Sequence, residues 1–339
     1  MRILSLFLAA IVTLHRTSEA QPATFASFAV APGLTVQRFD IDAAHSALEF
    51  SVRFMGLSRV RGAFSTFGGT LMYDSTDISR SSVSVFVSAA SINTNVASRD
   101  RDLKGPAFFD TEKFPRIFFT STRVERTDGG FLVRGPLTMH GVTREVAIPF
   151  TLLHPLTKDA WENRRIGFSG ALTVKRREFG ILGSAFWNNE FDPGRLSISD
   201  DVSIELLLSA EINNVDRWGT PKGDSLRAAA ERQGLAETLR AFREAARDTA
   251  SDAGRFSDEI LGGAAMKLMH HHRFADAVAI YQLAAELKPE RPSLHAALGE
   301  AQLLSGKRAD AIASFRRALA RDSIYTVAFE YLRRLDGKP

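Results

Sequence analysis

The sequence predicts two domains of different class: an eight-stranded antiparallel β-barrel over residues 38–214, then a small all-α module over residues 224–339. Up to about residue 214, apolar and polar side chains alternate with a period of two, as in half-buried strands. From residue 224 onward β-branched residues thin out, and alanine, leucine and charged residues recur with helical spacing. Gly219-Thr220-Pro221 marks a linker over residues 215–223 between the two.

The barrel prediction depends on eight runs with the strand pattern. In the first run, for example, Phe50, Val52 and Phe54 alternate with polar Ser51 and Arg53. The runs are 46–55, 58–73, 80–90, 115–124, 130–139, 142–153, 164–175 and 200–212. Short turns between so many strands favour a closed barrel, because closure removes the exposed edges of an open sheet. A barrel of this size has room for one small ligand.

The first twenty residues have the pattern of a signal peptide. Met1-Arg2 gives a positive start, residues 3–14 are almost wholly apolar, and Ser18-Glu19-Ala20 offers a cleavage site. The apolar segment is too short to cross a bilayer, which needs roughly 20 residues. We therefore expect a soluble protein that does not span a membrane and is periplasmic or secreted.

Composition excludes several kinds of chemistry. The chain has no cysteine, which rules out disulfides, thiol catalysis and cysteine zinc sites. Its net charge is +4, but the arginines are spread along the chain, so nucleic acid is not a predicted partner.

The helical segment contains a repeat of 34 residues. Small, aromatic and small side chains recur at matched positions, namely Ala277, Tyr281 and Ala284, then Ala311, Phe315 and Ala318. This pattern resembles the tetratricopeptide repeat, with copies at 258–291 and 292–325. The second copy has Gly306 at its turn, where the first has His272. Helices over 235–247 and 326–335 are expected to complete the stack, which then packs on the barrel or binds a protein partner.

The barrel segment carries an ordered set of short motifs. They are Phe39-Asp40-Ile41-Asp42, Ala44-His45-Ser46, Phe50-Ser51-Val52, Met55-Gly56, Val60-Arg61-Gly62, Phe64, Arg99-Asp100, Leu103, Phe108-Phe109-Asp110, Phe114-Pro115, Leu137-Thr138-Met139-His140-Gly141-Val142-Thr143-Arg144 and Phe179-Gly180. In this order they resemble the YceI-like family of lipid- or polyisoprenoid-binding proteins. The resemblance implies a lipocalin-like barrel, usually exported in bacteria, that accepts a long isoprenoid chain such as a quinone tail. Two positions depart from the family pattern, where Asp102 replaces a frequent histidine and Ala107 an acidic residue.

Strand parity predicts which side chains face the barrel interior. The predicted ligand-binding set is Phe50, Val52, Phe54, Phe64, Leu71, Val83, Val85, Val87, Ile117, Phe119, Phe131, Val133, Leu137, Phe168, Leu172, Ile204 and Leu206. These side chains either line a lipid cavity or pack a filled core. Polar His45, Arg99, Asp100 and His140 stand beside turns and are expected to position a head group; alternatively, Arg99 and Asp100 pin the 95–110 connection to the rim.

The predicted function is therefore binding of a long-chain apolar lipid, polyisoprenoid or quinone-like, with the helical repeats serving protein interaction. We find no nucleophile motif, phosphate loop or dinucleotide fingerprint, so catalysis is not predicted. No metal site is predicted, because consecutive helical residues such as His270, His271 and His272 point in different directions. No cofactor is expected beyond the lipid itself. The alternatives are an interaction scaffold with a filled barrel and an enzyme acting on a barrel-bound lipid.

Overall fold

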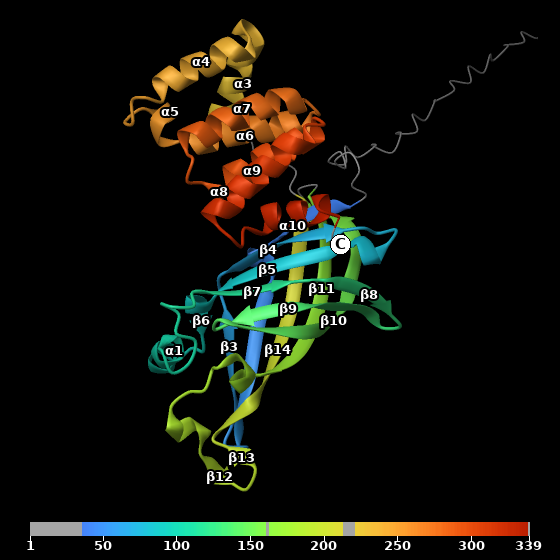
Figure 1. The fold of residues 1–339 in the computed structure, drawn as a ribbon, viewed down its shortest axis with the longest axis vertical. Coiled ribbons are helices and arrows are strands. Elements are labelled where there is room, and N and C mark those ends of the chain that lie inside the picture. The colour runs from blue at the N-terminus through green and yellow to red at the C-terminus, as the bar shows by residue number, and fades with distance from the viewer. Residues whose placement is uncertain (1–35, 161–162, 213–220, 338–339) are drawn as a thin grey trace, which may run out of the picture.

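The structure, a computed structural model, describes residues 36–160, 163–212 and 221–337. The predicted signal peptide at residues 1–20 and residues 215–220 of the predicted linker lie outside these ranges. Figure 1 shows a strongly curved sheet with a group of helices packed across strands at one end of it.

The strands are β1 (Gln37–Ile41), β2 (Ala47–Phe54), β3 (Ser58–Phe64), β4 (Phe67–Tyr73), β5 (Ser82–Ser88), β6 (Ile92–Asn93), β7 (Arg116–Thr120), β8 (Arg123–Thr127), β9 (Gly130–Met139), β10 (Val142–Lys158), β11 (Arg164–Lys175), β12 (Glu190–Asp192), β13 (Arg195–Leu196) and β14 (Ile198–Ile212). Helix α1 (Ala97–Lys104) and the 3-10 helices η1 (Ala43–His45), η2 (Ile78–Arg80), η3 (Ala89–Ser91), η4 (Arg176–Phe179) and η5 (Ala185–Asn188) lie between them. The remaining helices are α3 (Pro221–Gln233), α4 (Leu235–Ala245), α5 (Asp252–Arg255), α6 (Ser257–His270), α7 (Phe274–Leu287), α8 (Pro292–Leu304), α9 (Arg308–Arg321) and α10 (Thr326–Leu335).

The sheet closes into a ring of eight antiparallel strands. Their order is β1-β4-β5-β7-β9-β10-β11-β14, and β14 pairs back onto β1. The register of this last pair places Asp40 opposite Glu211 and Ile41 opposite Ala210. The predicted fold class, an antiparallel eight-stranded barrel followed by helices, is confirmed.

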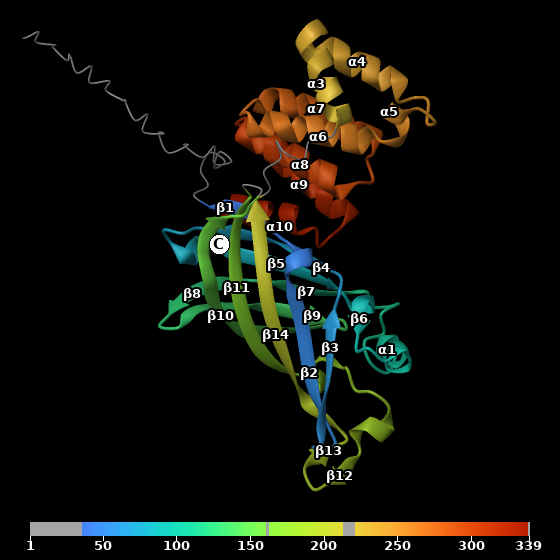
Figure 2. The same cartoon turned by 180° about the vertical axis from the view of Figure 1, so that it is seen from behind.

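Strands β1 and β2 behave as one strand that is interrupted by η1. The β1 part pairs with β4 and β14, whereas the β2 part pairs with β3 and β14. Apart from β2, strand β3 pairs within the described ranges only with β6, through Ala63 and Phe64. The β2–β3 hairpin therefore extends past the ring at the end away from the helices, close to β12 and β13 (Figure 2).

Aromatic side chains fill the barrel at the end near the helices. Phe39 of β1 is fully buried and meets the Tyr73 ring edge-on, with centroids 6.3 Å apart. Tyr73 in turn meets Phe168 at 6.4 Å, and buried Ile166 belongs to the same cluster. Such edge-to-face contacts add to the free energy of apolar burial, so this end of the interior is packed rather than open.

The helices after residue 221 pack as antiparallel neighbours around alanines. The matched residues Ala277, Ala284, Ala311 and Ala318 have no exposed surface, so the helix backbones approach closely. At the two turns, 34 residues apart, His272 has φ +58° and Gly306 has φ +80°. Glycine adopts this left-handed conformation without strain, whereas histidine does so at a cost. None of the helices in the described ranges has the length and apolar character needed to cross a bilayer.

The helical module packs on the outside of the barrel mainly through α10. Glu330 of α10 is fully buried, and its two carboxylate oxygens accept hydrogen bonds from Ser82 and Ser84 of β5, each 2.6 Å long. Thr326 and Thr70 of β4 share a buried hydrogen bond of 2.9 Å. Of the two outcomes expected for the helical stack, packing on the barrel is therefore present.

More distant contacts widen this interface. Arg38 of β1 donates to Glu300 of α8 at 2.7 Å, and Arg116 of β7 donates to Asp322 at 2.6 Å. Apolar Val36 and Met72 belong to the same buried cluster as side chains of α8, α9 and α10. Burial and charge pairing thus join the two domains over several strands.

We expect Glu330→Ala to lower the free energy of unfolding by about 2–4 kcal/mol, because it leaves buried hydroxyl groups and the neighbouring Arg333 without their acceptor. Urea denaturation measures the change. The control is Glu286→Ala, which removes an exposed ion pair with Arg243 and should cost less than about 1 kcal/mol. Equal effects of the two substitutions would show that the buried carboxylate does not hold the domains together.

Candidate functional site

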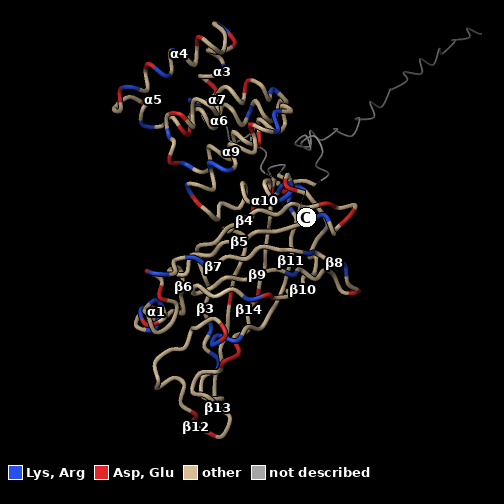
Figure 3. The backbone as a smooth tube through the Cα atoms, in the orientation of Figure 1, with Lys and Arg blue, Asp and Glu red and all other residues tan. Residues whose placement is uncertain are grey.

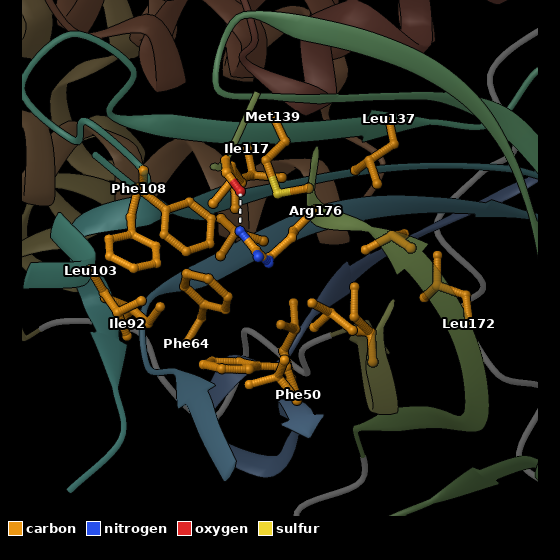
Figure 4. A pocket seen from close by; sticks show the side chains of 18 of the residues that line it. Phe50, Phe64, Ile92, Leu103, Phe108, Ile117, Leu137, Met139, Leu172 and Arg176 are labelled. Atoms are coloured by element: carbon orange, nitrogen blue, oxygen red, sulfur yellow. Dashed lines mark hydrogen bonds between the residues drawn. The ribbon is translucent and has the colours of Figure 1, made fainter. Parts of the chain in front are cut away.

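The barrel encloses a cavity of about 470 Å³ whose lining is mostly apolar. Figure 4 shows Phe50, Phe64, Leu137 and Leu172 among the side chains directed into it. Of the side chains predicted to face inward, those on this cavity are Phe50, Val52, Phe54, Phe64, Val83, Val85, Val87, Ile117, Phe119, Leu137, Leu172, Ile204 and Leu206. The interior is therefore not completely filled by its own side chains.

A second cavity, of about 60 Å³, lies next to the aromatic cluster of Phe39, Tyr73 and Phe168. The remaining members of the predicted inward set, Leu71, Phe131, Val133 and Phe168, line this smaller space. Because Val83, Phe150 and Leu208 line both cavities, the two are neighbours along the barrel axis.

Segments outside the regular strands line the other end of the large cavity. Helix α1 contributes Ser98, Arg99, Asp102 and Leu103, and the connection that follows β11 contributes Ile181 and Trp187. Phe108 and Phe109 also line this end. The alternation of strand residues could not identify these side chains, because loops and short helices have no period of two.

Arg176 places a positive charge in the cavity wall. Its side chain is almost fully buried, and its guanidinium donates only to uncharged oxygens. The acceptors are the carbonyls of Ile181, Leu182, Ile198 and Ser199 and the side-chain oxygen of Asn188. Burial lowers the pKa of the Arg176 guanidinium, and Asp200 offsets this only in part. Arginine nevertheless stays protonated, so it holds the loop over the cavity and supplies a charge there.

Arg99 and Asp100 both bind the loop residue Thr94. Arg99 lines the cavity while donating to the Thr94 hydroxyl at 2.8 Å and to its carbonyl at 2.9 Å. Asp100 accepts from the Thr94 amide at 2.9 Å and is not among the lining residues. Asp100 thus pins the start of α1, and Arg99 does this while also facing the cavity.

The two histidines expected to position a head group are not among the side chains that line the cavity. The His45 side chain is 65% exposed, and its Nδ1 donates to Asp42 at 2.6 Å. His140 Nδ1 donates to the carbonyl of Phe179 at 3.1 Å while its ring packs on Phe114. Neither residue lines the cavity.

His45 belongs instead to a polar cluster around Arg165. Burial raises the pKa of the Asp42 carboxyl, but hydrogen bonds from Arg165 and His45 outweigh this and lower it. Arg165 also pairs with Asp159, at 2.6 Å, and with Glu211. The cluster ties η1 to β11 and β14, beside the point where β1 and β14 close the barrel.

Because the pKa of Asp42 is lower in the folded protein than in the unfolded chain, where it is about 3.9, the ionised carboxylate stabilises the fold at pH values above about 3.9. This stabilisation is lost as the pH falls through the pKa of the folded state. We therefore expect the free energy of unfolding to fall less between about pH 6 and about pH 3 in Asp42→Asn than in the parent protein. Urea denaturation at the two pH values measures it. Asp128→Asn, in an exposed turn, should leave the loss unchanged; an Asp42 variant with the full wild-type pH dependence would contradict the assignment.

Comparison with known proteins places this barrel in a family. The family model of the YceI-like domain matches residues 39–210. The chain belongs to the YceI-like family. The match spans the barrel from β1 to β14 and ends before the helices of the C-terminal module.

Proteins similar in sequence to this chain come from several bacteria. A UPF0312 protein of Vibrio vulnificus is 36% identical over 143 residues, covering 42% of this chain and 75% of the relative. One from Shewanella putrefaciens is 36% identical over 157 residues, covering 45% and 82%.

Solved structures include Burkholderia cenocepacia BcnA, 22% identical with a TM-score of 0.42, covering 50% of this chain and 98% of that one. A polyisoprenoid binding domain from Saccharophagus degradans, implicated in plant cell wall breakdown, is 17% identical with a TM-score of 0.38, covering 52% and 98%.

Proposed function

We propose that this YceI-like protein binds one long apolar lipid, of the polyisoprenoid or quinone type, inside its barrel. The observation that carries the proposal is the cavity of about 470 Å³, whose lining is apolar along β2, β5, β7 and β14. A concave, mostly apolar space with a few convergent polar groups is the usual form of a small-molecule site.

The polar groups gather at one end of the cavity and suit a head group. Ser98, Arg99 and Asp102 come from α1, and Arg176 comes from the segment after β11. Arginine and hydroxyl donors bind quinone carbonyl or phosphate oxygens, so the head group is proposed to lie here and the tail to run toward the aromatic cluster at Phe39.

The energy balance favours long tails. Each buried methylene contributes roughly 0.8 kcal/mol, whereas immobilising a ligand costs on the order of 4–15 kcal/mol. A tail of about 15 carbons or more outweighs that cost. The proposal concerns binding, with no catalytic step.

Export and a role for the helices complete the proposal. The pattern of residues 1–20 supports secretion into the periplasm or beyond. Helices α6 to α9 are proposed to be tetratricopeptide-like repeats, in keeping with their buried, matched alanines. Faces of α8 and α10 contact the barrel, so a protein partner would use the remaining surface of the module.

Tail length tests the lipid proposal directly. We expect the affinity for quinones to rise at least tenfold between tails of about 10 and about 20 carbons. Fluorescence titration of Trp187, which lines the cavity, measures it. A flat series would refute the proposal.

Neighbouring leucines on β14 give a matched pair of variants. Leu206 lines the cavity, whereas Leu207 points outward with 48% exposure. Leu206→Trp fills part of the cavity and should weaken lipid binding by about tenfold or more, while Leu207→Trp should leave it unchanged. Equal affinities of the two variants would place the ligand outside the barrel.

A further inference from the structure

Large apolar side chains are exposed together at the barrel end farthest from the helices. Leu57, in the β2–β3 turn, is 83% exposed, and Phe186, in η5, is 65% exposed. The Phe54 and Trp187 rings, 6.2 Å apart, join the hairpin to η5, and Phe186 packs edge-on against Trp187 at 4.8 Å. Single exposed apolar residues are common on soluble proteins, but these two belong to segments whose Phe54 and Trp187 line the cavity.

The same hairpin carries cations without counter-ions. Arg53 and Arg59 stand directly opposite each other in the β2–β3 register, and exposed Arg61 follows. Residues 50–73 contain no Asp or Glu, and among the described residues the side chains of the three arginines have no ion pair or hydrogen bond. Like charges facing each other across strands destabilise a hairpin, so the arrangement has a cost that an anionic partner would offset.

Three aspartates in the segments near the hairpin do not neutralise these arginines, because each is paired with another cation. The pairs are Asp192 with Arg195, Asp200 with Arg177, and Asp201 with Lys175. Figure 3 shows the charged residues near the lower end of β3 and β14. The hairpin charge is therefore available to an external anion.

Both features adjoin the cavity. Arg53, Phe54 and Trp187 belong to its lining, while Leu57, Arg59 and Phe186 lie just outside it. Along Ser58–Arg61, strand β3 pairs only with β2 among the described residues. A lipid leaving the cavity at this end would emerge between exposed apolar side chains and unpaired guanidinium groups.

We propose that this end, formed by the β2–β3 hairpin and η5, docks on a membrane surface that contains anionic phospholipid. The proposal rests on the proposed function, because lipid exchange needs the cavity mouth to face a bilayer. Leu57 and Phe186 enter the boundary between head groups and acyl chains, and Arg53, Arg59 and Arg61 bind the phosphates around them. Apolar insertion combined with cationic attraction is the usual basis of such interfacial binding.

Vesicle flotation of the full chain tests the docking surface. We expect binding to phosphatidylcholine vesicles with about 30 mol % phosphatidylglycerol to exceed binding to pure phosphatidylcholine, and to fall at high salt. The triple variant Leu57→Ser, Arg59→Gln, Phe186→Ser should bind the anionic vesicles on the order of tenfold more weakly.

A matched control carries Arg126→Gln and Leu153→Ser, which remove an exposed arginine and an exposed leucine elsewhere on the barrel. It should bind vesicles like the parent. The proposal is overturned if the parent ignores phosphatidylglycerol, or if the triple variant binds as well as the parent.

A separate titration with detergent-solubilised quinone distinguishes this proposal from the lipid-binding one. The triple variant should keep the parental affinity, because none of its three positions lines the cavity, but should take up quinone more slowly from vesicles. Vesicle binding without any quinone binding would contradict the proposed function but would still support the docking surface. Arg59→Gln alone should not lower the melting temperature, since it removes a like-charge pair.

Discussion

The structure depends on the closure of one sheet, through the pairing of β1 with β14. Closure gives the sheet an inside and an outside, so alternate residues of every strand face either the cavity or the surroundings. The bend at η1 allows one stretch of chain to close the ring through β1 and then to leave it through β2. This produces a packed end at Phe39 and places the β2–β3 hairpin at the opposite end. The Arg165 cluster, beside the closing pair, fixes this bend.

Much of the barrel could be predicted from the sequence, because strict alternation specifies a face. Phe50, Val52 and Phe54 lie on the cavity for that reason. Arg176 and Trp187 could not be found this way, because their segment is irregular and long-range folding brings it over the barrel end. His45 and His140 do not line the cavity, and a turn in the sequence does not indicate whether a side chain beside it faces the interior. The buried contact of Glu330 with Ser82 joins residues 248 positions apart, and no local pattern indicates it.

Both faces of strand β5 are covered, one by the barrel interior and the other by helix α10. Val83, Val85 and Val87 point into the cavity, while Ser82 and Ser84 point outward and are buried by α10. A surface strand would ordinarily leave such serines to water. Here their hydroxyls satisfy a carboxylate that would be costly to bury alone. Valine and serine therefore alternate along β5 from Ser82 to Val85 because one face meets an apolar cavity and the other meets the carboxylate of Glu330.

The two ends of the barrel consequently differ in mechanical character. Helix α10 covers the outer face of β4 and β5, and Phe118 of β7 packs against Phe329, so the wall behind Val85 and Ile117 is supported from outside. At the other end, most of β3 pairs with β2 alone among the residues that the structure describes. A change in cavity volume that a lipid requires would be opposed by the covered wall, whose packing is dense and resists displacement. The hairpin end has fewer contacts to break, and local opening favours such regions. For the lipid binding proposed above, this difference favours entry and exit at the hairpin, with the helices supporting the far wall.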